Sequence, residues 1–366
     1  MKRTMPLCLA AGLAFLLSPS MTEAGELLDR LRLFTGRDVN HVDVVESAPA
    51  SESGGEGLDA VRATAEVSDL APLVTLSALA ADPGPASSTT IADQPRARRP
   101  LQSDHAFDGF VSPLTNPAFF EDPRSLTELR FWVMNQLIPE SNALDGGDFQ
   151  VYALQARLAL TERLSFIAVK DGYISLQPDA VVPDTDGWAD VAAGLKYALV
   201  RNPQKQFLLS AGFTYEIDLG THRVFQGTGD GIWNPFLSAG WEFYPRTHYL
   251  TTFAYRLPNN TTDNSQSFIW SHHFDHQIGC RFYPAVELHW LHYTKSGEAL
   301  PFDFEGGDLI NLGSADVAGN DLFVMAAGFA YKLSEAVQLA VAYEFPVSSR
   351  EDILDERVTA NLILRY

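Results

Sequence analysis

The most restrictive feature of this sequence is the spacing of its alternating segments from Leu126 to the C-terminus. About twelve segments of roughly ten residues follow one another, and the connections between them are short and long in turn. An even number of strands, with short turns on one side and longer loops on the other, is what a closed outer-membrane β-barrel requires. A soluble sandwich gives no reason for that alternation. We therefore predict an all-β fold, a single antiparallel transmembrane β-barrel of about 12 strands over residues 126–366.

The last segment, Glu356 to Tyr366, shows the strand pattern most clearly. Its apolar residues fall on every second position and end in an aromatic side chain, and only an extended strand sorts side chains with a period of two. The terminal Tyr366 resembles the aromatic residue by which outer-membrane barrels are recognised, so we expect the barrel-assembly machinery as a partner. The predicted strands are 126–138, 148–160, 163–174, 188–199, 206–217, 232–243, 247–256, 268–282, 285–294, 321–333, 336–345 and 356–366. The predicted short connections are Thr161-Glu162, 200–205, 244–246, Tyr283-Pro284 and Ser334-Glu335.

Each predicted strand has an apolar face, expected to contact outer-membrane lipid, and a polar face, expected to line the lumen. Outward residues such as Tyr152, Leu195 and Trp241 combine apolar centres with aromatic ends, as the interfacial girdles of a membrane barrel do. Charges of both signs on the polar faces should pair inside a narrow barrel, because unpaired buried charge is costly. Arg281 is assigned to this polar face as well. The predicted lumen-lining candidates are Glu128, Arg130, Arg157, Lys196, Glu216, Glu242, Glu287, His289, Lys332 and Glu344.

The residues before the barrel divide into three parts. Lys2 and Arg3 precede a short apolar run, and small residues follow it, which predicts a cleaved signal peptide over residues 1–24 and export to the bacterial outer membrane. Residues 25–102 are rich in Ser, Glu, Gly, Pro and Ala, which predicts a low-complexity, mostly disordered periplasmic extension. Residues 103–125 are rich in Phe and Pro. We expect them to form an ordered but irregular lead-in that plugs or braces the barrel from the periplasmic side.

The charge balance excludes one class of partner. The chain has 46 acidic and 26 basic residues, a net charge of −20, which argues against binding to nucleic acid. Acidic residues are dense in the predicted loops at 184–190, 303–308 and 351–356. We interpret them as solvated loops, and a cation-attracting vestibule is the alternative.

One strand carries a family resemblance. The segment from Gly187 to Tyr197, GWADVAAGLKY, resembles the G-x-x-D-x-x-x-G-x-K-Y strand of outer-membrane transporters of the meta-pathway of phenol degradation type. Residues Leu160 to Leu164 are similar to that family's strand–turn–strand, and Thr228 to Gly231 to its glycine-containing loop. The resemblance covers residues 126–260 and implies a barrel that passes small solutes, including hydrophobic or aromatic ones. The N-terminal extension and the loop 295–320 depart from the family pattern.

Two clusters contain side chains that could hold a metal ion. Five histidines lie in two consecutive predicted strands, but alternation separates them between the two faces, so one site would need side chains from both. The loop 303–308 carries three acidic residues that could bind Ca²⁺, although it lacks the spacing of an EF-hand. We predict no metal and no cofactor. The histidines are His272, His273, His276, His289 and His292.

Serine and histidine residues near the same strands are candidates for a catalytic pair. The outer-membrane phospholipase, also a barrel, uses a Ser/His pair on its lipid-facing side. The candidates in this chain are His292 with Ser296 and Ser271 with His273, and neither pair stands in a motif resembling that enzyme's. The sequence has no G-x-S-x-G elbow. We therefore predict no enzymatic activity.

The predicted function is an outer-membrane channel for passive passage of small solutes, with the paired charges of the lumen setting its polarity. The first alternative is a closed structural barrel that anchors its loops or the N-terminal extension. An autotransporter-type translocator with residues 25–102 as its passenger and an outer-membrane lipid hydrolase are further alternatives. The strand number does not decide, because twelve strands lie between side-chain-filled barrels and open porins.

Overall fold

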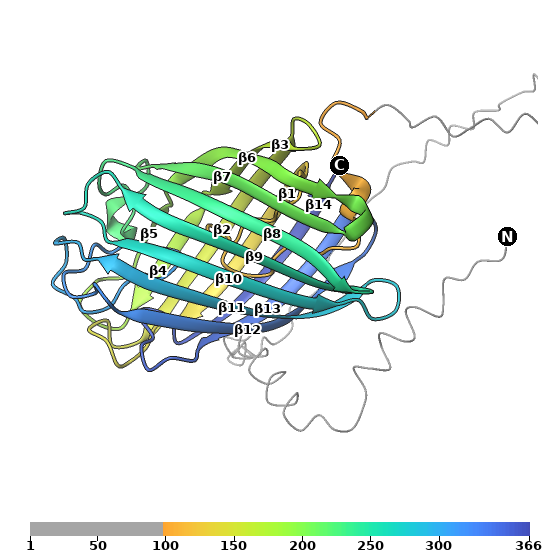
Figure 1. Ribbon diagram of the computed structural model, residues 1–366. Coiled ribbons are helices and arrows are strands. Elements are labelled where there is room, and N and C mark those ends of the chain that lie inside the picture. Colours follow the sequence, from red (N-terminus) through yellow and green to blue (C-terminus); the bar gives the residue numbers. More distant parts are fainter. Residues whose placement is uncertain (1–97) are drawn as a thin grey trace, which may run out of the picture. The chain divides into compact units, whose positions relative to one another are not determined.

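The strands of the protein form one antiparallel sheet that closes on itself, as its computed structural model shows (Figure 1). The structure describes residues 98–366, so the predicted signal peptide and nearly all of the predicted extension lie outside the described residues. The first strand pairs with the second on one side and with the last on the other. The strands are β1 (Glu128–Leu137), β2 (Gly147–Ala159), β3 (Leu164–Lys170), β4 (Tyr173–Pro178), β5 (Thr185–Trp188), β6 (Val191–Asn202), β7 (Phe207–Ile217), β8 (Ile232–Tyr244), β9 (Thr247–Pro258), β10 (Gln266–His276), β11 (Phe282–Lys295), β12 (Asp321–Lys332), β13 (Val337–Pro346) and β14 (Glu356–Arg365). The short 3₁₀ helices are η1 (His105–Phe107), η2 (Pro203–Lys205) and η3 (His222–Val224).

These segments occupy twelve positions around the barrel. Strands β3 and β4 both pair with β2, while β6 pairs with β3 and β5 with β4, so each of these two positions is one interrupted strand. The first interruption lies at Asp171, whose carboxylate accepts a hydrogen bond from the Leu154 backbone nitrogen (2.9 Å). Gly172 follows with a φ of 120°, and a Cβ there would lie 2.6 Å from the Tyr152 carbonyl oxygen. The predicted fold class, a closed all-β barrel, is confirmed.

One predicted turn is wrong. Tyr283-Pro284 lies inside β11, where Pro284 is opposite Phe329, and the turn itself spans residues 277–281. Proline lacks a donor but is tolerated near the start of a strand, so it did not mark the turn. Gly279, with a φ of 63°, allows the tight reversal instead. The other predicted short connections agree with the structure to within a few residues.

The outer wall of the barrel is apolar. The predicted outward residues Tyr152, Leu195 and Trp241 are 49%, 41% and 49% exposed. Large apolar side chains are exposed along most of the strands, which is what a lipid-facing wall requires. Within residues 98–366, no helix is long and apolar enough to cross a membrane.

Two connecting segments fill the inside of the barrel. Residues 103–126, here called the plug segment, enter at the end where the C-terminus lies (orange in Figure 1). Residues 296–320, here called the mouth loop, join β11 to β12 at the end that carries the long connections. Most side chains of the plug segment and the central part of the mouth loop are buried. The candidate site is therefore the lumen wall together with the two segments that occupy it.

Candidate functional site

The plug segment is an irregular chain with a dense set of buried side chains. Its prolines at 113, 117 and 123 have no backbone donor, which keeps this chain from adding to a sheet. Its aromatic rings pack in small groups against the wall, where Phe107, Phe110 and Phe120 contact Leu208 and Leu250. Alanines of β11, β12 and β13 leave room for other plug residues. The second apolar group consists of Val111, Leu114, Tyr283, Ala285, Ala330, Ala340 and Ala342.

Glu121 is the main charged anchor of the plug segment. Arg157 on β2 donates to it through Nη2 (2.6 Å) and Nε (3.1 Å), and Lys196 on β6 donates through Nζ (2.6 Å). The side chains of Arg157 and Lys196 are 1% and 2% exposed. Lys196 also donates to the Asp122 carbonyl oxygen. Burial of three charges is tolerated here because each has an opposite partner and further hydrogen bonds.

Hydroxyl groups on neighbouring strands receive the plug backbone. Ser210 on β7 donates to the Pro123 carbonyl (2.6 Å), and both Ser238 on β8 (2.6 Å) and Thr252 on β9 (2.9 Å) donate to the Glu121 carbonyl. Ser210 is opposite Ser238 in the strand register, and Ser238 is opposite Thr252. Three adjacent strands therefore present a row of hydroxyls at one level of the lumen.

On the other side of the lumen a carboxylate binds the plug amides. Glu287 on β11 accepts hydrogen bonds from the backbone nitrogens of Leu114 (2.7 Å) and Thr115 (2.9 Å), and also from the Thr115 hydroxyl. His273 contacts the same carboxylate through Nδ1 (2.6 Å). The Thr115 hydroxyl also lies 2.8 Å from His289 Nε2. The plug is thus held by an acidic group where it presents amides and by basic groups where it presents a carboxylate.

The plug segment is also held where it enters the barrel. Arg201 on β6 makes a two-pronged ion pair with Asp104 (2.7 and 2.8 Å). Lys332 at the end of β12 donates to the carbonyls of residues 108, 109 and 110 at 2.6 to 3.1 Å. Arg365 on β14 donates to Ser112 (3.1 Å) and to Glu128 (2.8 Å). Within the plug, Arg124 and Asp122 form an ion pair of 2.6 Å.

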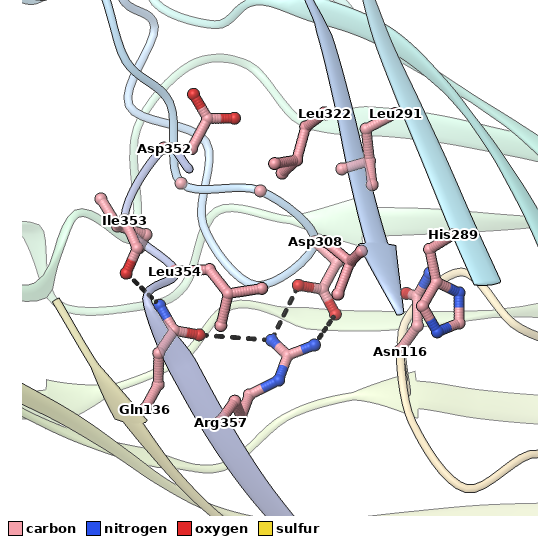
Figure 2. A pocket seen from close by; sticks show the side chains of 13 residues that line it. Asn116, Gln136, His289, Leu291, Asp308, Leu322, Asp352, Ile353, Leu354 and Arg357 are labelled. Carbon is pink, nitrogen blue, oxygen red and sulfur yellow. Dashed lines mark hydrogen bonds and ion pairs between the residues drawn. The ribbon is translucent and has the colours of Figure 1, made fainter. Parts of the chain in front are cut away.

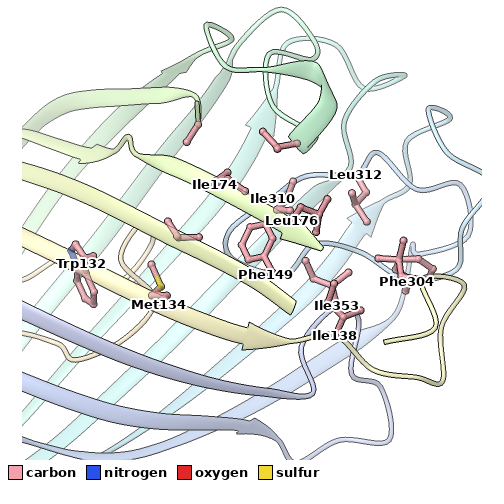
Figure 3. Packing of buried hydrophobic residues seen from close by; sticks show 14 residues of the cluster. Trp132, Met134, Ile138, Phe149, Ile174, Leu176, Phe304, Ile310, Leu312 and Ile353 are labelled. Carbon is pink, nitrogen blue, oxygen red and sulfur yellow. The ribbon is translucent and has the colours of Figure 1, made fainter. Parts of the chain in front are cut away.

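The mouth loop occupies the opposite end, and part of its backbone is bound by one of its own side chains. Glu305 accepts hydrogen bonds from the loop's backbone nitrogens at 306, 312 and 314 (2.8 to 3.0 Å). Phe304, Ile310 and Leu312 join a cluster with wall residues that include Phe149 (Figure 3). The predicted calcium loop therefore has its central carboxylate engaged with backbone amides.

One ion pair fixes the mouth loop to the wall. Arg357 on β14 binds Asp308 through both terminal nitrogens (2.8 and 3.0 Å) (Figure 2). Its Nε also donates to Glu344 (2.9 Å). A cavity remains beside this pair, between the mouth loop and Asn116 of the plug segment. It holds about 10 Å³, room for a single water molecule. A second cavity of about 30 Å³ lies nearby, between Pro117 of the plug segment and Leu309 of the mouth loop. The two segments thus occupy the lumen at this level and leave only small cavities between them.

The structure places most predicted lumen candidates inside the barrel. Lys332 is half-buried at the plug entrance. Their part in a conducting path stays a prediction. The buried candidates are Glu128, Arg130, Arg157, Lys196, Glu216, Glu287, His289 and Glu344.

One inward assignment holds only at a strand end, and another is corrected. Glu242 is opposite the buried His248 in the strand register, so it keeps the inward side of β8, and a bulge follows it, between Glu242 and Tyr244. Its side chain is only half-buried, and its carboxylate accepts a hydrogen bond from the Arg246 backbone nitrogen (2.8 Å) in the turn to β9. Arg281 is exposed in the turn 277–281 and donates to the Leu333 carbonyl.

The histidines lie on both faces, as alternation predicts. His273 and His289 are buried inside, while His272 and His292 are only partly buried on the outer side. The proposed Ser/His pairs have other partners: His292 contacts Asp321 (2.8 Å), and the Ser296 hydroxyl accepts from loop nitrogens at 317 and 318. Ser271 contacts His289 (2.9 Å) beneath the plug segment.

Sequence reasoning missed three important residues. Arg357 and His248 occupy inward positions of their strands, so the alternation could have identified them. The His248 imidazole contacts Asp275 (2.7 Å) and packs against Phe110 of the plug segment. Glu121 could not be assigned in this way, because the plug segment has no period that tells which side chain meets the wall.

Only the comparison with solved structures finds proteins similar to this chain, and the similarity concerns the fold. No family model matches the sequence, and no curated protein matches it. Among solved structures, the COG4313 outer membrane channel from Pseudomonas putida F1 is similar at a TM-score of 0.50 and 12% identity, over 70% of this chain and 100% of that chain. Two porins are more distant. The NanC porin has a TM-score of 0.42 and 11% identity, over 66% of this chain and 99% of that chain. The KdgM porin has a TM-score of 0.38 and 10% identity, over 65% of this chain and 99% of that chain. The chain therefore shares the closed β-barrel fold of the first of these structures.

Proposed function

We propose that the protein is an outer-membrane channel for passive passage of small solutes, closed in the described state by the plug segment. The observation that carries the proposal is the contrast between an apolar outer wall and a lumen wall of charged and hydroxyl side chains. A barrel that served only as an anchor could fill its interior with apolar side chains, which avoids the cost of burying charge. A lumen that conducts needs polar groups facing the path.

The contacts of the plug segment fit a gate. Hydroxyl, ammonium and carboxylate groups of the wall bind mostly the plug backbone, and water can replace each of these hydrogen bonds when the segment withdraws. Withdrawal is an order–disorder transition of one segment, a common form of switching. The strand hydrogen bonds need not change.

We place the barrel in the bacterial outer membrane after export by a cleaved signal peptide, with lipid against its apolar wall and with Tyr366 as the signal for the assembly machinery. The suggestion of hydrophobic or aromatic solutes rests on the resemblance of residues 187–197 to transporters of the phenol meta-pathway type. The charged wall near Glu121 favours polar solutes instead.

Single-channel conductance in planar bilayers tests the proposal. The informative variant is Ser238→Ala with Thr252→Ala, which removes both donors to the Glu121 carbonyl. We expect rare openings in the wild type and about thirtyfold more open time in the variant, because each of the two lost hydrogen bonds weakens the plug by about 1 kcal/mol. Thr251→Ala is the matched control, since Thr251 donates to the Ser271 carbonyl and touches no plug residue among its described hydrogen bonds. It should behave as the wild type.

The closed structural barrel remains the second candidate, because segments fill the lumen from both ends. It predicts silence in all three proteins while heat-modifiable gel mobility shows that each barrel is folded. That result would overturn the channel proposal.

A further inference from the structure

We propose that Arg157 and Lys196 form a binding site for the carboxylate of a passing solute, and that Glu121 occupies this site in the closed state as a tethered substitute. The inference rests on the proposed channel function and names its substrate class. The solute would be a small organic acid with a second oxygen acceptor a few bonds from its carboxylate.

The geometry around Glu121 is that of a carboxylate receptor. Arg157 faces the carboxylate with Nε and Nη2, which reach both oxygens at 2.6 to 3.2 Å, and Lys196 approaches one oxygen at 2.6 Å. The planar fork of an arginine matches the two oxygens of a carboxylate, and a lysine adds a compact charge. Both cations belong to the barrel wall, while Glu121 belongs to the segment that must leave.

The same site recognises a second oxygen. Ser238 and Thr252 both donate to the backbone carbonyl of Glu121 itself (2.6 and 2.9 Å), and the Thr252 hydroxyl also lies 3.0 Å from the Ser238 oxygen. The wall thus binds the two oxygen functions of one glutamate residue at once. A free solute that carries a carboxylate and a nearby carbonyl or hydroxyl oxygen presents the same pattern.

Charge makes an empty site unfavourable. Arg130, Arg157 and Arg365 share the single carboxylate of Glu128, at 3.3, 3.5 and 2.8 Å. With Lys196, the wall has four cations against one carboxylate here, an excess of three positive charges once Glu121 withdraws. Buried unpaired charge is costly, so the open lumen should take up an anion at this level. The excess of cations at this level of the lumen wall contrasts with the net charge of −20 of the whole chain.

The consequence is competition. Glu121 and a solute carboxylate cannot both occupy the site, so a solute that binds only the open state shifts the population toward that state. A permeating acid would therefore promote opening of its own path.

The test uses the full chain in planar bilayers, with sodium acetate as probe and acetamide as its neutral analogue. In the wild type, acetate should raise the open fraction about tenfold above the level in acetamide at equal concentration. Glu121→Gln should open more often than the wild type, and acetate should no longer increase its open fraction. Acetate should instead reduce the chloride current of this variant by occupying the vacated site.

Asp104→Asn is the matched comparison. It loosens the plug segment at the Arg201 ion pair, where the segment enters the barrel, and leaves Arg157, Lys196 and Glu121 unchanged. Its open fraction should rise and should still respond to acetate. If the variants conduct but acetate acts no differently from acetamide, the carboxylate site is wrong while the channel stands. If the wild type and both variants are silent although folded, the proposed function itself fails.

Discussion

The plug segment and the mouth loop both fill the lumen, but they obtain their hydrogen bonds from different places. The plug backbone is bound by side chains of the wall, from Ser210 and Ser238 on one side to Glu287 on the other. The mouth loop satisfies three of its own amides with Glu305 and buries Phe304 in an apolar cluster. The plug segment therefore depends on side chains of the wall for much of its backbone hydrogen bonding, whereas the mouth loop supplies part of its own.

This difference indicates which segment moves. Water can replace wall hydroxyls and charges around a withdrawn plug, so its withdrawal exposes small apolar groups such as Phe107, Phe110 and Phe120. Movement of the mouth loop would expose Phe304, Ile310 and Leu312, which belong to a larger buried apolar cluster. We therefore expect the plug segment to act as the gate and the mouth loop as a fixed constriction. The following changes test that division of roles.

The largest effect is expected from Lys196→Glu. It places a second carboxylate beside Glu121 and removes a partner from a buried ion pair, which costs about 3–5 kcal/mol. The plug segment should be expelled, with at least about a hundredfold rise in open fraction, and ion selectivity should move toward cations. The open fraction and the reversal potential in a salt gradient measure both effects. Lys205→Glu, in an exposed turn, is the control. Unchanged selectivity in a conducting variant would remove Lys196 from the path.

A smaller effect, and of another kind, is expected from Arg357→Gln. The change leaves Asp308 and Glu344 as buried carboxylates without their ion pair, so the free energy of unfolding should fall by about 3 kcal/mol. The open fraction should stay near the wild-type value, because Arg357 holds the mouth loop. Denaturant unfolding and conductance test the two statements, with exposed Arg281→Gln as the control. A large rise in open fraction would show that the mouth loop is also a gate.

The smallest effect concerns pH at the mouth. Burial raises the pKa of Asp352 from 3.8 to about 6, against the opposing effects of Arg350 and the hydrogen bond from Tyr293. The folded protein therefore holds a proton that the unfolded chain releases, so this contribution to stability is present below about pH 4 and is lost as pH rises through 6. The wild type should lose unfolding free energy between pH 4.5 and 7.5, and Asp352→Asn should lose less. Equal pH dependence of both proteins would contradict the assignment.

The sequence predicted the inward residues of the barrel wall better than the contacts of the plug segment inside it. Alternation placed Arg157, Lys196 and Glu287 inside the barrel because every second side chain of a strand shares a face. It failed at Arg281, which lies in a turn that was predicted at the wrong place. The plug segment has no period at all, so its position could be suggested by its Phe and Pro content but its partners could not. Those contacts join residues far apart in the chain, such as Thr115 and Glu287.

The position of the plug segment also has a consequence for folding. The barrel closes where β1 meets β14, so the seam forms only after almost the whole chain is available. Arg365, near the end of the last strand, contacts both Ser112 of the plug and Glu128 of the first strand. Contacts of such high sequence separation form slowly, because loop closure must precede them. A plug that already occupies the centre offers the late strands a surface to assemble on, so the gate of the finished barrel would also be its folding template.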